Sequence, residues 1–144
     1  RAQGSDREGR LHRGGRLEEL RDLSLDAVGG PVLGAAPLVG ALASESFRRG
    51  RPIPTFLVRR EAKGHGTAKL IEGLFPTGGT VALVEDVVTT GGSVLRALAV
   101  ARGEGVKVAR ILCVVDREQG GAEAMAEQQV DYRALFKVSE LLGG

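Results

Sequence analysis

The stretch that most constrains the fold is Val81–Ser93, in which an apolar run meets two acids and then a loop of hydroxyl and glycine residues. Val81–Val84 form a run too short and too uniformly apolar for a surface helix, which predicts a buried strand of a parallel sheet. Glu85 and Asp86 follow at once. Since carboxylates rarely lie unpaired in a core, we expect these acids to mark the point where the chain leaves the sheet at its carboxyl edge, where open α/β sheets bind ligands.

The segment after the acids has the composition of an anion-binding loop. It consists of Thr89, Thr90, Gly91, Gly92 and Ser93, and a helical pattern begins at Val94. Glycines let backbone N–H groups turn inward, and a helix start leaves further N–H groups unpaired. A phosphate would fit there. The acids would repel that phosphate, so we expect them to face sugar hydroxyls or a magnesium ion.

Val84–Ser93 resembles the phosphoribosyl-pyrophosphate (PRPP) signature of type I phosphoribosyltransferases. The segment contains neither the Gly-x-Gly-x-x-Gly dinucleotide fingerprint nor a Walker A loop. The alternative is an ordinary turn between a core strand and its helix, with acids there by chance. The resemblance implies that Glu85 and Asp86 act in catalysis and that Thr89–Ser93 bind the substrate.

A second glycine-containing segment precedes the signature by one βα unit. We expect a brief strand from Asp26, a tight turn at Gly29 and Gly30, and a helix from about Pro37 to Arg49. Val28–Pro37 is similar to the pyrophosphate-binding loop of orotate phosphoribosyltransferases, which implies that Gly29 and Gly30 bind substrate, often beside a cis peptide. A strand-to-helix turn needs glycines for its own geometry, so both roles stay open.

A charged, glycine-containing loop, Arg59–Gly66, follows a predicted strand at Thr55–Val58, and Ala68–Phe75 could be the returning strand of a hairpin. Its composition suits a mobile, solvated connection. Yet Arg60–Gly66 matches the Arg-Glu-Ala-Lys-x-His-Gly pattern of orotate phosphoribosyltransferases. Cationic side chains there could stabilise the charge that grows on pyrophosphate as the ribose C1 bond breaks.

The resemblance assigns roles within this loop. It implies that Lys63 and His65 are catalytic and that Arg59 and Arg60 bind substrate. In the family this loop reaches into the neighbouring subunit's site, so a homodimer is implied, with residues 59–66 completing the partner's site.

Another charged segment, Asp116–Gly121, follows the next predicted strand at Val106–Val115. The resemblance implies that Arg117 binds the carboxylate of orotate, a role that suits a bidentate guanidinium. A salt bridge between Arg117 and a nearby acid is the alternative.

The order of elements predicts a single α/β domain over residues 1–144, with a type I phosphoribosyltransferase-like parallel sheet of about five strands, helices on both faces and an inserted flexible hairpin loop. We expect residues 1–15 to form an irregular arm, followed by a short amphipathic helix through Leu17, Leu20 and Leu23. The family's amino-terminal hood over the base is absent from Arg1–Arg16, so it is missing or has diverged.

Composition excludes several classes of function. Lys and Arg total 20 against 18 Asp and Glu, so the net charge of +2 demands no nucleic-acid partner. No apolar run approaches the roughly 20 residues that span a membrane, which favours a cytoplasmic protein. Cys113 is expected in the core, and no Cys/His cluster suggests zinc. The resemblance implies Mg²⁺ bound through the substrate, with no dedicated all-protein site.

These observations predict an orotate phosphoribosyltransferase that converts PRPP and orotate into orotidine 5′-monophosphate and pyrophosphate. One alternative is a non-catalytic PRPP-sensing regulator that binds nucleic acid through the arginine-rich amino end. Another is a phosphoribosyltransferase for a different nucleobase.

Overall fold

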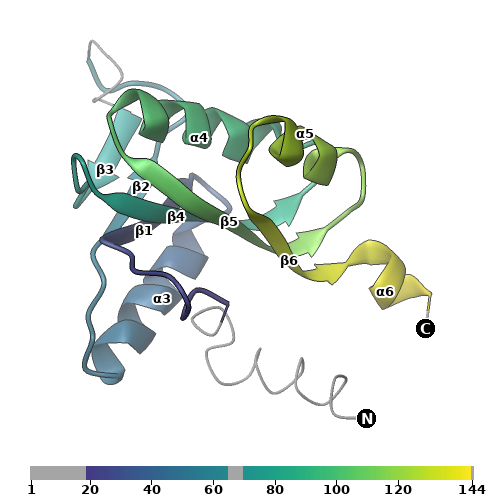
Figure 1. Cartoon of the computed structure of the whole chain (residues 1–144), viewed down its shortest axis with the longest axis horizontal. Helices are drawn as coiled ribbons and strands as arrows, with labels where there is room; N and C mark the ends of the chain where they lie inside the picture. Colours follow the sequence, from purple (N-terminus) through teal and green to yellow (C-terminus); the bar gives the residue numbers. More distant parts are fainter. Residues whose placement is uncertain (1–18, 65–69, 144) are drawn as a thin grey trace.

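A computed structural model of the chain describes residues 19–64 and 70–143. These residues form a six-stranded sheet in the order β3-β2-β1-β4-β5-β6, with helices on both faces (Figure 1). The strands are β1 (Ala27–Pro31), β2 (Thr55–Val58), β3 (Ile71–Gly73), β4 (Thr80–Val88), β5 (Lys107–Asp116) and β6 (Tyr132–Lys137). The helices are α3 (Ala36–Arg48), α4 (Gly92–Gly103), α5 (Gly121–Glu127) and α6 (Val138–Leu142).

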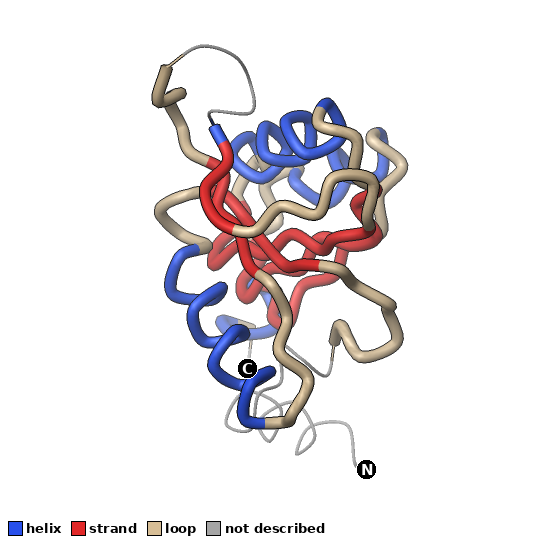
Figure 2. Tube along the Cα trace, turned by 90° about the vertical axis from the view of Figure 1, so that its left-hand side faces the viewer, coloured by secondary structure: helices blue, strands red, loops and turns tan. Residues whose placement is uncertain are grey.

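The predicted fold class is confirmed, with one more strand than expected. Five strands run parallel, and the short β3 pairs antiparallel with β2 at one edge of the sheet. Figure 2 shows the strands lying between helices on the two faces of the sheet. β3 is the returning strand of the predicted hairpin. It begins at Ile71, and residues 65–69 of the predicted loop and strand lie outside the described residues.

The alternating side chains of β4 divide the core into two layers. Val81 and Leu83 belong to the cluster that includes Leu98 of α4, while Ala82 and Val84 belong to the cluster that includes Leu42 of α3. Successive residues of a strand point to opposite faces, so a strand that is apolar throughout must be covered on both sides. Figure 1 shows α4 and α5 on one side of the sheet and α3 on the other.

β4 does not end at the acids, as the sequence predicted, but continues to Val88. Its neighbour β5 is equally long, so Glu85 still pairs with Cys113 and Val88 with Asp116. Polar residues at the end of the strand are tolerated because they reach a pocket instead of the core. Cys113 itself is fully buried, as expected.

The predicted turn at Gly29 and Gly30 is also wrong, since both glycines lie inside β1. A β-carbon on Gly29 would lie 2.4 Å from the ring of Phe56, and one on Gly30 would lie 2.2 Å from the carbonyl oxygen of Val84. These glycines therefore permit close packing within the sheet. The cis peptide bond joins Val32 and Leu33, in the loop that follows β1.

A buried arginine that sequence analysis did not single out fixes the segment before β1. Arg110, on β5, is 2% exposed and donates to both carboxylate oxygens of Asp22 and to the carbonyl of Glu19. Asp131 accepts a further hydrogen bond from it at 2.8 Å. The arginine holds residues 19–22 as a turn in place of the expected helix, whose first residues lie outside the described range.

No helix within residues 19–64 and 70–143 combines the length and the apolar character that a membrane span requires. The arm at residues 1–15, with His12, lies outside the described residues.

Candidate active site

A pocket of about 550 Å³ opens at the carboxyl edge of the sheet, between the ends of β1 and β4. It is lined by Pro31, Val32, Leu33, Gly34, Arg60, Glu85, Asp86, Val87, Gly92, Ser93 and Arg96. The fold thus brings together three segments that lie far apart in the sequence: the β1–α3 loop, the start of the charged loop, and the β4–α4 signature.

The acid pair belongs to this lining. Glu85 is 5% exposed, whereas Asp86 is exposed and accepts a hydrogen bond from the N–H of Val87 at 2.7 Å. Burial and the side-chain hydrogen bond with Asp86 together raise the pKa of Glu85 to about 7, while a hydrogen bond from Ser93 opposes the shift. Near neutral pH, Glu85 can therefore both donate and accept a hydrogen bond.

The β1–α3 loop packs directly on these carboxylates. A β-carbon on Gly34 would lie 2.3 Å from Oδ1 of Asp86 and 2.3 Å from Oε1 of Glu85. Only a residue without a side chain leaves both oxygens accessible. Gly34 is a site residue that sequence analysis missed, because its importance comes from a contact with residues about fifty positions later.

The β4–α4 loop has the backbone conformation expected of an anion-binding site. Gly91 has a φ of 92°, which favours glycine, and the first hydrogen bond of α4 runs from Leu95 N–H to Gly91 at 2.9 Å. The N–H groups of residues 92–94 precede that bond, so they stay available for an anion. A small hollow of about 40 Å³ lies inside the loop, lined among others by Thr89, Gly91 and Ser93. Thr90 is exposed.

Helix α5 supports this loop from behind. A β-carbon on Gly121 would lie 2.5 Å from Cγ1 of Val88 and 3.0 Å from the carbonyl oxygen of Thr89. Met125, fully buried, lies next to Gly91. The packing limits the freedom of the loop to move away from the acids.

Arg96 of α4 holds the start of the charged loop beside the pocket. Its guanidinium donates to the carbonyl of Arg59 at 2.9 Å and to that of Arg60. Arg59 itself pairs with Glu72 across the β2–β3 hairpin, while Arg60 lines the pocket. Lys63 is exposed and is not among the lining residues, and His65 lies outside the described residues. Arg96 lacks any sequence signal, since an exposed helical arginine is common.

Arg117 follows β5 at the same edge. Its N–H donates to the carbonyl of Val88 at 2.9 Å, which ties the residue to the start of the β4–α4 loop. Within the described parts of the chain its guanidinium makes no ion pair. The expected alternative, a structural salt bridge, therefore gains no support from the described residues.

A buried hydrogen-bond chain fixes the turn that carries Arg117. Asp116, 2% exposed, accepts hydrogen bonds from the hydroxyl of Tyr132 at 3.1 Å and from the N–H of Glu118 at 2.7 Å. Burial strongly raises the pKa of Tyr132, so its hydroxyl keeps its proton and remains a donor. Glu118, with a φ of 59°, accepts in turn from the N–H of Ser139 at the start of α6.

The residues present could hold a metal only together with a ligand. In the described ranges no group of three or more His, Cys, Asp or Glu side chains lies close enough to bind an ion. Mg²⁺ is commonly held by one or two carboxylates plus substrate phosphates. The exposed carboxylate of Asp86 beside the anion-binding loop fits that pattern.

Known proteins resemble this chain in both sequence and fold. The phosphoribosyl transferase domain family matches residues 16–132. Orotate phosphoribosyltransferases from Aquifex aeolicus (45% identical) and Rhodopseudomonas palustris strain BisB5 (43%) each align with 87% of the chain, over 68% and 69% of their own lengths.

Solved structures agree with these sequence matches. Mycobacterium tuberculosis orotate phosphoribosyltransferase in complex with Fe(III) dicitrate superposes with a TM-score of 0.82 at 38% identity, covering 92% of this chain and 74% of that one. The same enzyme in complex with PRPP gives 0.79 at 36% identity, with the same coverage.

Proposed function

The chain belongs to the orotate phosphoribosyltransferases of the type I phosphoribosyltransferase family, and we propose that it transfers the 5-phosphoribosyl group of PRPP to orotate. The products are orotidine 5′-monophosphate and pyrophosphate, in de novo synthesis of the pyrimidine nucleotide UMP. One observation carries the proposal: the pocket places an acid pair between two strand-to-helix loops, one of which presents free helix amides.

The 5′-phosphate binds at the β4–α4 loop. The amides of residues 92–94 and the hydroxyls of Thr89, Thr90 and Ser93 supply donors around the small hollow there. No charged side chain is needed for this contact, because the helix start already carries partial positive charge.

The acid pair binds the ribose. Asp86 and Glu85 accept hydrogen bonds from the ribose hydroxyls, and the pKa of about 7 lets Glu85 also donate one. As the bond between C1 and pyrophosphate breaks, positive charge grows on the sugar. A carboxylate held nearby stabilises that charge more in the transition state than in the ground state.

The pyrophosphate is bound in the pocket beside residues 31–34. Arg60 and Arg96 belong to the same lining. We place Lys63 and His65 over the leaving group when the charged loop closes, where they exclude water and stabilise the released charge. In a homodimer, residues 59–66 would complete the partner's site.

Mg²⁺, bound by Asp86 and the substrate, would neutralise charge on the pyrophosphate. Arg117 orients orotate by pairing its guanidinium with the carboxylate of the base. Its fixed backbone next to Val88 supports this role. The proposed reaction uses water-soluble substrates and takes place in the cytoplasm.

Loss of orotate absorbance with PRPP and Mg²⁺ tests the proposal. We expect turnover with orotate and none with uracil, adenine or hypoxanthine. Arg117→Gln should raise the KM for orotate at least tenfold, while Arg102→Gln, an exposed arginine at the end of α4, leaves it unchanged. Absence of turnover beside an active control enzyme would refute catalysis, and turnover with another base would refute the assigned specificity.

A further inference from the structure

A second pocket, of about 560 Å³, lies at the other end of β1 from the candidate active site. It is lined by Leu20, Arg21, Leu23, Ser24, Leu25, Val28, Ser46, Arg49, Arg51, Pro52, Ile53 and Pro54. Val28 N–H bonds to Pro54 at 3.0 Å, which places this pocket at the amino ends of β1 and β2. The lining of the candidate active-site pocket includes Pro31, the last residue at the opposite end of β1.

The two walls of this pocket are rigidly held. On one side, the turn at residues 19–22 is fixed by the buried guanidinium of Arg110 through Glu19 and Asp22. Leu20 of that turn is 4% exposed. The pocket is therefore pre-formed on this side, as ligand sites in proteins commonly are.

The other wall is the end of α3 and the chain that follows it. Gly50 has a φ of 76°, and the N–H of Arg51 bonds back to the carbonyl of Ser46 at 3.0 Å, which closes the helix with a Schellman motif. The buried hydroxyl of Ser46 accepts a hydrogen bond from the N–H of Ile53, also at 3.0 Å. These bonds fix the backbone from which Arg51 projects.

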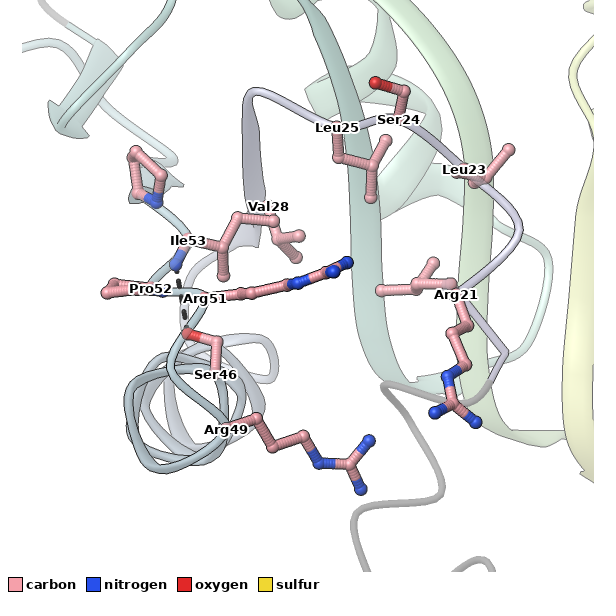
Figure 3. Close-up of a pocket in the computed structure, with 12 residues that line it drawn as sticks. Arg21, Leu23, Ser24, Leu25, Val28, Ser46, Arg49, Arg51, Pro52 and Ile53 are labelled. Carbon is pink, nitrogen blue, oxygen red and sulfur yellow. Dashed lines mark hydrogen bonds between the residues drawn. The ribbon is translucent and has the colours of Figure 1, made fainter.

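The lining of this pocket combines apolar side chains with arginines. Leu25 and Ile53 pack against the core yet stay partly open, and with Val28 they give the pocket an apolar floor. Three lining residues are arginines, and none of the described lining residues is acidic. Figure 3 shows the side chain of Arg51 extending into the cavity beside Val28 and Ile53, while the guanidinium groups of Arg49 and Arg21 lie apart from it.

Among the three arginines of the lining, Arg51 is the one whose side chain extends into the cavity (Figure 3). Glu45 already pairs with Arg49 at 3.2 Å, so part of that charge is neutralised. Arg51 has no ion pair with any described residue. Its guanidinium extends into the cavity beside apolar side chains (Figure 3), where it can donate charge-assisted hydrogen bonds to an anionic ligand.

We propose that this pocket is a second ligand site, which binds a phosphate monoester carried on a flat apolar ring. The dianionic phosphate pairs with Arg51, because a planar guanidinium group matches two phosphate oxygens in a bidentate way. The ring covers Leu25, Val28 and Ile53. Since the site involves none of the residues of the candidate active site, it stands independently of the proposed reaction.

Methyl-labelled protein titrated with phenyl phosphate tests the proposal by NMR. The methyl signals of Leu25, Val28 and Ile53 report on this pocket, and those of Val32, Leu33 and Val87 report on the active-site pocket. We expect saturable shifts in the first group. Inorganic phosphate and phenol, which each carry half of the ligand, should bind there at least tenfold more weakly.

Two variants complete the experiment. Arg51→Gln should weaken phenyl phosphate binding at this pocket at least tenfold, whereas Arg102→Gln should leave it unchanged. The thermal midpoint should stay the same in both, because the exposed side chain of Arg51 contributes no described hydrogen bond to the fold. Shifts confined to the active-site methyl groups, no saturable shifts at all, binding unaffected by Arg51→Gln, or phosphate alone binding equally well would each overturn the proposal.

Discussion

Two glycine pairs that look alike in the sequence have different roles in the molecule. Gly29 and Gly30 lie inside β1, where a side chain would overlap Phe56 or Val84. Gly91 and Gly92 lie at the start of α4, where the first has a φ of 92° and the second faces the pocket. One pair thus permits close packing, while the other shapes the loop that lines the candidate active site.

The loops that follow each strand differ in the same way. Before α3, the N–H groups of Ala35 and Ala36 bond back to Pro31 and Leu33, and Pro37 has no N–H. Before α4, the N–H groups of residues 92–94 precede the first helical bond. A glycine-containing strand-to-helix turn therefore binds an anion through its helix start only when its own turn does not use those amides.

The largest expected effect is a loss of stability on substitution within the pair Gly29 and Gly30 inside β1. Gly30→Ala would place a β-carbon 2.2 Å from the backbone oxygen of Val84 and 2.6 Å from Ala35. Neither neighbour can move without shifting β4 or the start of α3, so we expect the free energy of unfolding to fall by about 3 kcal/mol or more. Urea denaturation measures this free energy of unfolding. Gly40→Ala, in an open position on α3, is the control, and a stable Gly30→Ala variant would contradict the packing role.

A smaller loss is expected at Gly91. Alanine there must adopt a φ of 92°, and its β-carbon would approach Met125 at 3.1 Å. We expect a loss of about 2 kcal/mol in unfolding free energy. Because the phosphate loop would be distorted, the affinity for PRPP should fall as well. A variant that loses stability but binds PRPP normally would show that the loop conformation does not matter for binding.

Gly92→Ala should separate binding from stability. A β-carbon on Gly92 meets only the hydroxyl of Thr90, at 4.0 Å, so unfolding free energy should change by no more than about 0.5 kcal/mol. The methyl group would occupy the anion-binding hollow, and the KM for PRPP should rise roughly tenfold, or about 1.4 kcal/mol. Gly103→Ala, at the open far end of α4, should leave both quantities unchanged. Equal KM values for the two variants would argue against the hollow as the phosphate site.

The smallest effect concerns Glu85, which lies between the two loops. Its pKa is about 7 in the folded protein against 4.5 ordinarily, so the folded state holds a proton that the unfolded state releases. Stability from this group is therefore fully present below about pH 4.5 and falls as pH rises to about 7. After solvent screening, we expect a loss of roughly 1 kcal/mol. Urea midpoints at pH 5 and pH 8 should differ less in Glu85→Gln than in the wild type, and identical pH dependence would contradict the shift.

The comparison of the two glycine pairs also shows how far sequence reasoning reaches. The apolar runs correctly predicted β2, β4 and β5, and the helical spacings predicted α3 and α4, because these patterns depend on neighbours within a few residues. The sequence also placed Glu85 and Asp86 beside the phosphate loop, since all of them belong to one short segment. It misassigned Gly29 and Gly30, whose partners lie on other strands.

By itself, then, the sequence determined the family and the α/β class, and it brought acids, hydroxyls and glycines together at Val84–Ser93. The tertiary structure alone decided that β4 continues past its acids, that Gly34 lies against their carboxylates, and that Arg96 and Arg110 hold distant segments in place. The physical reason is that these contacts join residues about 28 to 91 positions apart. Their existence depends on which strands become neighbours, and no local pattern specifies that order.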